Sequence, residues 1–169
     1  MRRTWLAALA VAVLVSPAGA ATSLHTVRVD DFSLSVPSDW QTLTRIGTVR
    51  LLTRTMVPQS GFYVNANVVV TPDQGGPPTG TGMRFHLLRM LRGAGINLTS
   101  LSIGSARLPA GSATVMRYRG TMGTHRLRWL AYVLHAHGRA YVLTFTAGQT
   151  TFSRNAGLFA SMARSFRIG

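Results

Sequence analysis

The sequence has no cysteine, no lysine and no glutamate. Without cysteine, disulfides, thiolate metal sites and thiol nucleophiles are excluded. The lipidated cysteine that anchors bacterial lipoproteins is excluded as well. All 18 basic residues are arginine and the four acidic residues are aspartate, so the formal net charge is +14. This excess favours polyanionic partners or an anionic membrane surface. The same balance is typical of GC-rich coding bias and of proteins exposed to acid outside the cytoplasm.

Few acids also leave little room for acid–base catalysis. Asp30 and Asp31 are adjacent, so in a strand they would point to opposite faces of the sheet. Asp39 follows a proline and a serine and is expected to organise a turn. The Gly-x-Ser-x-Gly, P-loop and complete Gly-x-Gly-x-x-Gly motifs are absent. The segment 80–82, Gly-Thr-Gly before a predicted helix, fits either an anion-binding loop or an ordinary flexible one.

Residues 1–20 have the three parts of a signal peptide. Arg2 and Arg3 precede an apolar run of 11 residues that ends at Val15, and the small residues that follow end at Ala20. A membrane-spanning helix needs about 20 apolar residues. We therefore expect cleavage after Ala20 and export to the periplasm or the extracellular space without a lipid anchor. The arginine pair fits both the general and the twin-arginine export routes.

Residues 21–169 have the size of one domain with its own core. After cleavage, 16 arginines against 4 aspartates leave a net charge of +12. Alternating apolar residues and turn signals predict strands at 27–29, 32–36, 48–55, 62–71, 101–108, 112–119, 125–135 and 139–147. Turns are expected at 37–40, 120–123 and 137–138, and a flexible loop at 72–82.

Two segments have helical periodicity. The first begins at Met83 and ends near Gly95, with its apolar residues on one arc and its arginines on the other. The second covers about 151–165 and aligns Phe152, Phe159 and Phe166 on one face. Residues 127–134 are apolar on both alternating sets, so both faces of their sheet must be covered. One helix on each face would achieve this.

Four segments carry a family resemblance. They are Phe32–Trp40 (FSLSVPSDW), Asn65–Val70 (NANVVV), Tyr141–Ala147 (YVLTFTA) and Phe152–Phe166, which ends in FASMARSF. Together they resemble the PsbP-like group, which includes exported DcrB-type and LpqN-type proteins. The resemblance implies a single α+β domain: an α/β/α sandwich on a mainly antiparallel sheet of about six or seven strands. It also implies a mostly non-catalytic accessory role. DcrB-type and LpqN-type proteins usually carry a lipid anchor, which this chain lacks, and the matched residues include no reactive site.

Histidines are the only candidate metal ligands of the chain outside the four aspartates. His125, His135 and His137 follow one alternation and would share a strand face. The structural alternative is that His137 belongs to a turn and His135 ends a strand. Because no acid or thiol lies nearby in sequence, we expect no metal site and no cofactor.

The most distinctive feature is a predicted arginine-rich hairpin. If residues 112–119 and 124–135 pair through an even-numbered loop, Arg117 faces Arg126, and Arg119 and Arg128 share that face. The opposite face would then hold Met116, Tyr118, Leu127 and Trp129. Guanidinium groups bind phosphate and carboxylate in bidentate fashion. The four arginines are thus candidate anion or partner ligands, or a solvated rim of the sheet. Arg84 and Arg92 of the first helix are further candidates.

These patterns favour a non-enzymatic exported accessory or binding domain that engages a protein or envelope partner. Adhesion to an anionic polymer or anionic membrane through the arginine-rich face is the alternative. A small metal-dependent or hydrolytic enzyme is a second alternative. Nucleic acid is disfavoured, because Phe85 is the single aromatic residue among the arginines of the first helix. Partner identity and oligomeric state are not specified by the sequence.

Overall fold

The computed structural model describes residues 22–73, 88–89 and 91–169. The expected signal peptide, the segment 80–82, most of the 72–82 loop and Arg84 lie outside the described residues, as does most of the first predicted helix. Residues 88–89 and 91–93 of that helix are described and helical. Among the described residues, no helix is long and apolar enough to cross a membrane.

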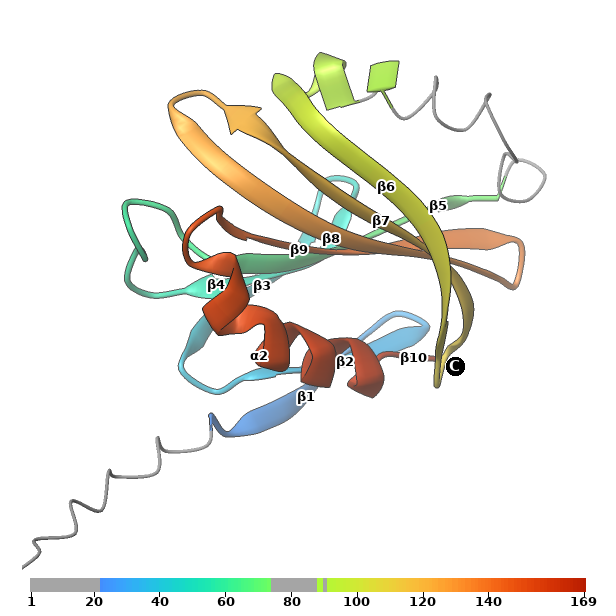
Figure 1. Cartoon of the computed structure of the whole chain (residues 1–169). Helices are drawn as coiled ribbons and strands as arrows, with labels where there is room; N and C mark the ends of the chain where they lie inside the picture. The colour runs from blue at the N-terminus through green and yellow to red at the C-terminus, as the bar shows by residue number, and fades with distance from the viewer. Residues whose placement is uncertain (1–21, 74–87, 90) are drawn as a thin grey trace, which may run out of the picture.

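Seven strands form one antiparallel sheet in the order β3-β4-β5-β9-β8-β7-β6 (Figure 1). Their bounds are β3 Trp40–Ile46, β4 Val49–Thr55, β5 Asn65–Pro72, β6 Ile96–Leu108, β7 Gly111–Met122, β8 His125–Ala136 and β9 Arg139–Gly148. Short connections join β6 to β7, β7 to β8 and β8 to β9. This half of the sheet is therefore a meander, in which neighbours in sequence are neighbours in space.

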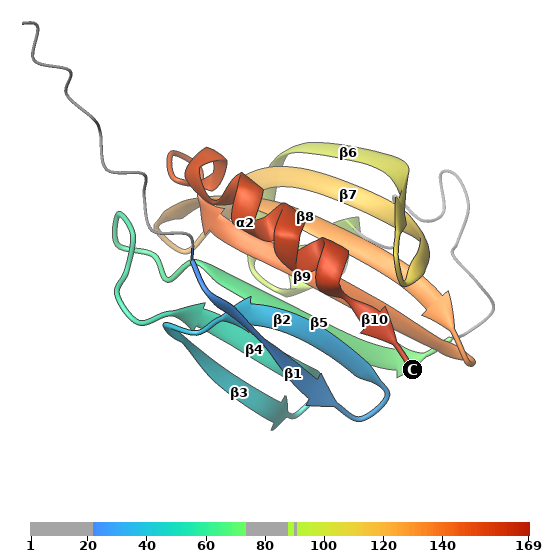
Figure 2. The ribbon, with the colours of Figure 1, turned by 90° about the horizontal axis from the view of Figure 1, so that it is seen from below.

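A second sheet of three strands lies against the first. It consists of β1 (Leu24–Val29), β2 (Phe32–Pro37) and the short β10 (Arg167–Ile168), with β2 in the middle. The helix α2 (Phe152–Ser165) lies beside this small sheet, and both cover the same face of the seven-stranded sheet (Figure 2). The Ser165 hydroxyl accepts a hydrogen bond from the Ser35 amide at 2.9 Å and ties α2 to β2.

The main core lies between this layer and the seven-stranded sheet. Phe159 of α2 is fully buried and stacks on Phe145 of β9, with 4.9 Å between ring centroids. Phe166, just after α2, packs against Phe32 of β2. Aromatic side chains each bury a large area, so this group is the main apolar stabilisation that joins helix, small sheet and large sheet.

The other face of the large sheet has its own, smaller core. Tyr118 stacks on Trp129 at 5.0 Å, and Met116, Leu127 and Ala131 pack around them. Leu91, from the helical residues before β6, is buried in this group. Helical residues thus lie on both faces, and the predicted single-domain PsbP-like α+β fold is confirmed.

Turn chemistry sets the register of the two central hairpins. His137 and Gly138 both have positive φ, 51° and 69°, as predicted for a tight β8–β9 turn. The β7–β8 turn is only Gly123 and Thr124, closed by Met122 paired with His125. The predicted turn at 120–123 is therefore wrong, because Gly120 belongs to β7.

Two further differences concern strand extent. Residues 37–40 were expected to form only a turn, but β3 begins at Trp40 and forms one edge of the large sheet. Strand β6 begins at Ile96, five residues before the predicted start. Both segments are rich in Thr, Ser, Asn or Gln, whose alternation is weak in sequence. Backbone pairing with β4 and β7 makes them strands.

Candidate functional site

The four hairpin arginines share one face of the sheet, as predicted. We call Arg117, Arg119, Arg126 and Arg128 the arginine row. Within it Arg119 pairs directly with Arg128, while Arg117 faces Leu130 and Arg126 faces Thr121. The expected Arg117–Arg126 pairing is wrong, because the shorter turn moves the partner of Arg117 four residues along β8. An even shift keeps every side chain on its predicted face.

The arginine row lies on the α2 side of the sheet. Leu130 of β8 pairs with Phe145, which stacks on the helix, so residues of the same alternation face α2. The Arg128 guanidinium lies over the ring of Phe152, the first residue of α2, at 4.7 Å from its centroid. A cation over an aromatic face gains electrostatic attraction and is held in place. Arg117 and Arg119 are exposed, between the helix and the β6 edge of the sheet.

The pKa of Tyr132 responds to the positive charges near this face. Burial raises the pKa of the Tyr132 phenol, while Arg117 and Arg164 of α2 act in the opposite direction by favouring the phenolate. Arg164, an exposed residue of α2, therefore lies close enough to Tyr132 to affect its pKa together with Arg117 of the arginine row. Sequence reasoning missed Arg164, because only the packing of α2 on the sheet brings it close.

Two serines complete the site on the neighbouring strand. In the β6–β7 register, Ser100 pairs with Arg119 and Ser102 with Arg117. A shallow depression of about 340 Å³ lies here, lined by Ser100, Leu101, Ser102, Arg117, Tyr118, Arg119 and Arg128. Guanidinium groups and hydroxyls are hydrogen-bond donors suited to phosphate or carboxylate oxygens. The arrangement can bind an anion, and its lining includes no carboxylate and no imidazole.

Three of the four aspartates are engaged elsewhere. Asp30 pairs with Arg45 at 3.0 Å, Asp31 with Arg139 at 3.0 Å and Asp73 with His135 at 2.9 Å. No ion pair among the described residues involves the arginine row. Like charges that face each other across a sheet destabilise it, so the Arg119–Arg128 pair favours an external anion.

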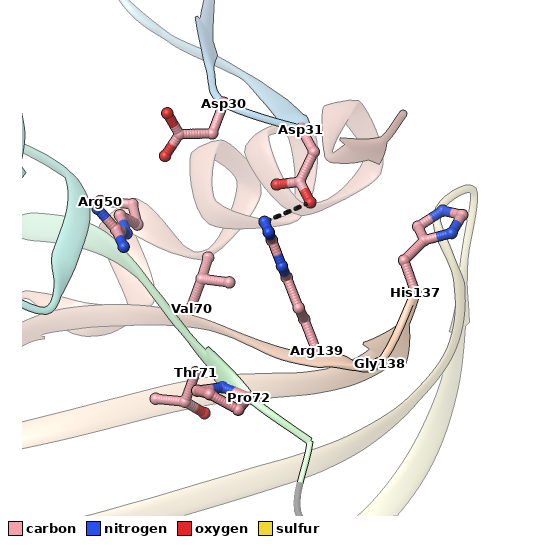
Figure 3. Close-up of a pocket in the computed structure, with 9 residues that line it drawn as sticks. All are labelled: Asp30, Asp31, Arg50, Val70, Thr71, Pro72, His137, Gly138 and Arg139. Carbon is pink, nitrogen blue, oxygen red and sulfur yellow. Dashed lines mark hydrogen bonds and ion pairs between the residues drawn. The ribbon is translucent and has the colours of Figure 1, made fainter.

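A second depression, of about 300 Å³, lies where the two sheets meet (Figure 3). Asp31, in the β1–β2 turn, reaches Arg139 of β9 across it. The Tyr141 hydroxyl donates a second hydrogen bond to the same Asp31 oxygen at 2.5 Å. This bond lowers the pKa of Asp31 more than the Arg139 charge does. Because Asp31 is already satisfied by protein partners, we interpret this depression as a structural junction.

The three candidate histidines have different surroundings in the structure. His125 packs edge-on against Phe62 at 5.6 Å, His137 is a turn residue with φ 51°, and His135 contacts Asp73. His125 and His135 are ten residues apart on one strand, about 33 Å at the usual rise. Among residues 22–73, 88–89 and 91–169, no group of three or more His, Asp or Glu residues could hold a metal ion. The His135–Asp73 contact joins residues 62 positions apart, which sequence reasoning did not foresee.

Arg92 is not part of the arginine row. It is exposed, and its neighbour Leu91 packs on the Tyr118–Trp129 side of the sheet, opposite the α2 face. Arg92 therefore belongs to a different face from the arginine row, and Arg84 lies outside the described residues.

The layered architecture, with a seven-stranded antiparallel sheet, a small sheet and α2, defines the PsbP-like α+β fold. No protein-family model and no curated protein sequence matches the chain. Solved structures do match. The cyanobacterial PsbP (CyanoP) of Synechocystis sp. PCC 6803 is 17% identical, with a TM-score of 0.66 over 92% of this chain and 99% of that one.

Two further similar structures widen the comparison. LpqN of Mycobacterium tuberculosis, described as involved in cell envelope biogenesis, is 14% identical, with a TM-score of 0.56 over 89% of this chain and 87% of that one. The Saccharomyces cerevisiae Ran-binding protein Mog1p is 9% identical, with a TM-score of 0.59 over 88% and 96%. At these identities the likeness establishes the fold.

Proposed function

We propose that the chain is an exported, non-enzymatic binding domain that engages an acidic surface of a protein or envelope partner through the arginine row. The observation that carries this proposal is the Arg119–Arg128 pair, two directly opposed cations outside every ion pair among the described residues. A complementary anion on a partner would relieve their repulsion and steer association. Two proteins of similar fold, a Ran-binding protein and a protein involved in cell envelope biogenesis, agree with a binding role.

The formal net charge of +14 supports a second candidate function, adhesion to an anionic polymer or membrane. Such adhesion depends on total charge and weakens steeply as salt screens it. Binding through the arginine row depends instead on which arginines are present. The two candidates therefore differ in their response to variants of equal charge.

The test compares two double variants of the mature protein. Arg119→Gln with Arg128→Gln removes the opposed pair, while Arg28→Gln with Arg89→Gln removes the same charge from exposed positions elsewhere. Crosslinking in the native envelope, followed by quantification of the captured partner, should show at least a tenfold loss for the first variant and little for the second. Equal loss in both would support adhesion by net charge. No loss in either would reject the arginine row.

Export is proposed on the leader alone and has its own test. N-terminal sequencing of the protein recovered from the periplasm or the medium should begin at Ala21. Recovery of a chain that still begins at Met1 from the folded, cytosolic fraction would contradict export.

A further inference from the structure

Strand β6 forms one edge of the large sheet, with no other described strand on its outer side. It has 13 residues, more than any other described strand, and Arg107 is its only charged residue. It contains no proline, and among the described residues it pairs only with β7. The outer side of such a strand presents backbone N–H and C=O groups that can pair with another chain.

The opposite edge strand, β3, is shorter and offers less free backbone. It has seven residues, and Arg45, with φ 58°, forms no ladder pair with β4, while its side chain pairs with Asp30. Strand β6 has one irregularity of its own, a register shift between Leu98 and Ser100, and its pairing with β7 is regular from Ser100 to Leu108. A short strand is a common way to keep an edge from pairing, so among the described residues β6 is the better edge for an added strand.

Side chains beside the open edge define what a new strand would meet. On the α2 face, Ser100 and Ser102 are exposed and short, with Arg119 and Arg117 directly behind them in β7. A strand added to β6 would lie about 4.8 Å away, and about twice that from β7. Long arginine side chains reach across short serines, so carboxylates at alternate positions of the new strand would meet guanidinium groups.

The other face of β6 differs. Leu101 and Ile103 belong to the Tyr118–Trp129 side, and Ile103 is 40% exposed. Apolar side chains at the remaining positions of an added strand would cover them. The edge therefore matches a segment in which acidic and apolar residues alternate, since successive side chains of a strand point to opposite faces.

We propose that β6 binds an extended acidic segment of a partner protein as an eighth strand of the sheet, with its carboxylates on Arg117 and Arg119 and its apolar side chains on Leu101 and Ile103. This inference rests on the proposed function and adds the mode of recognition, strand addition. A second copy of this chain is a poor occupant, because pairing β6 with β6 would bring two arginine rows to the same junction and add like-charge repulsion.

The probe is a nine-residue synthetic peptide of alternating aspartate and valine, and the readout is amide hydrogen exchange of the mature protein. Addition of the peptide should slow the exchange of outward-facing amides of Ile96–Leu108 at least tenfold and leave β3 unchanged. Two N-methylated peptides provide matched charge, one methylated at every aspartate and the other at every valine. Because successive N–H groups of a strand alternate in direction, one of them should lose binding and the other should retain it.

The outcomes separate this inference from the proposed function. If both N-methylated peptides bind like the parent, or if β6 exchange is unchanged while the peptide is bound, strand addition is wrong. Loss of binding in Arg119→Gln with Arg128→Gln would then still support the arginine row. A peptide with asparagine in place of aspartate should bind at least tenfold more weakly. No binding of the parent peptide, or a dimer whose β6 amides are already protected, would overturn the inference.

Discussion

The Tyr141 hydroxyl donates a 2.5 Å hydrogen bond to the carboxylate of Asp31, 110 residues earlier in the chain. Tyr141 belongs to β9 at the centre of the large sheet, and Asp31 to the turn that joins the two long strands of the small sheet. Arg139 donates to the same Asp31 oxygen at 3.0 Å. The two hydrogen bonds to Asp31 therefore fix the position of the small sheet relative to the large one.

Removal of the Tyr141 hydroxyl should destabilise the protein. We expect Tyr141→Phe to lower the free energy of unfolding by about 1.5–3 kcal/mol, the range for a hydrogen bond to a charged group. Urea denaturation of the mature protein would measure the change. Tyr63→Phe is the matched control, because Tyr63 is 41% exposed and its contact with Arg54 uses the ring face. An equal effect in both variants would contradict a specific role for the Tyr141–Asp31 bond.

The same pair predicts a dependence of stability on pH. The pKa of Asp31 is lowered from its usual 3.8, so its contribution is complete above that value and is lost as pH falls through the lower, folded-state pKa. Burial, with the help of Asp31, raises the pKa of Tyr141 to about 12. The folded state holds that proton more tightly than the unfolded chain, so stability should fall between pH 10 and about 12.

Tyr141→Phe should reduce the loss of stability at both acidic and alkaline pH. Some alkaline loss should remain, because burial also raises the pKa of Tyr118 to about 12. Chemical denaturation at a series of pH values would measure the free energy of unfolding. A variant profile parallel to that of the wild-type protein at both extremes would disprove the linkage to Tyr141 and Asp31.

Gly120 is expected to tolerate no side chain. A Cβ atom there would lie 2.3 Å from the backbone oxygen of Asn97 in β6, where the register shifts between Leu98 and Ser100. Gly120→Ala should therefore cost about 1–3 kcal/mol through overpacking. Gly157→Ala is the control, because an added Cβ would have nothing within 4 Å and alanine is more favourable than glycine in the interior of a helix by about 1 kcal/mol. Thermal unfolding should shift in opposite directions for the two variants.

Of the variants considered, the one that disrupts the packing of α2 should lower the free energy of unfolding most. Phe159 is fully buried and contacts Phe145 and Phe152. Phe159→Ala should lower the free energy of unfolding by about 3–5 kcal/mol. Phe62→Ala should cost clearly less, since Phe62 is half-buried at the margin of the smaller core. Similar losses in denaturation curves of the two variants would contradict this view of the core.

Local patterns predicted most strands because each one alternates apolar and polar residues or carries a turn residue at its end. His137 and Gly138 specified the β8–β9 turn through positive φ. The β7–β8 turn was harder, because both Gly120 and Gly123 fit a turn in sequence. Only the close approach of Asn97 to Gly120 explains why that glycine is needed inside a strand. Each hairpin arginine lies on its predicted face despite this error, but the predicted pairing of Arg117 with Arg126 was wrong.

Contacts between distant segments explain what sequence could not provide. Nothing near Asp73 indicates His135, and nothing near Tyr132 indicates Arg164, because tertiary packing brings each pair together. The edge position of β6 depends on the order of all seven strands. Candidate residues of the site were therefore predictable by type and face, while their neighbours required the structure.

Three of the four aspartates lie at the end of the sheet that contains the β8–β9 turn, while the arginine row runs along β7 and β8 toward the Gly123–Thr124 turn. Each of these aspartates has a basic partner, Arg45, Arg139 or His135, whereas the arginine row has no ion-pair partner among the described residues. Uncompensated positive charge is therefore present toward the Gly123–Thr124 end, and the field of a negatively charged body would attract that end and turn it forward before contact. The protein would then meet an acidic partner already oriented, with the open edge of β6 beside the approaching surface.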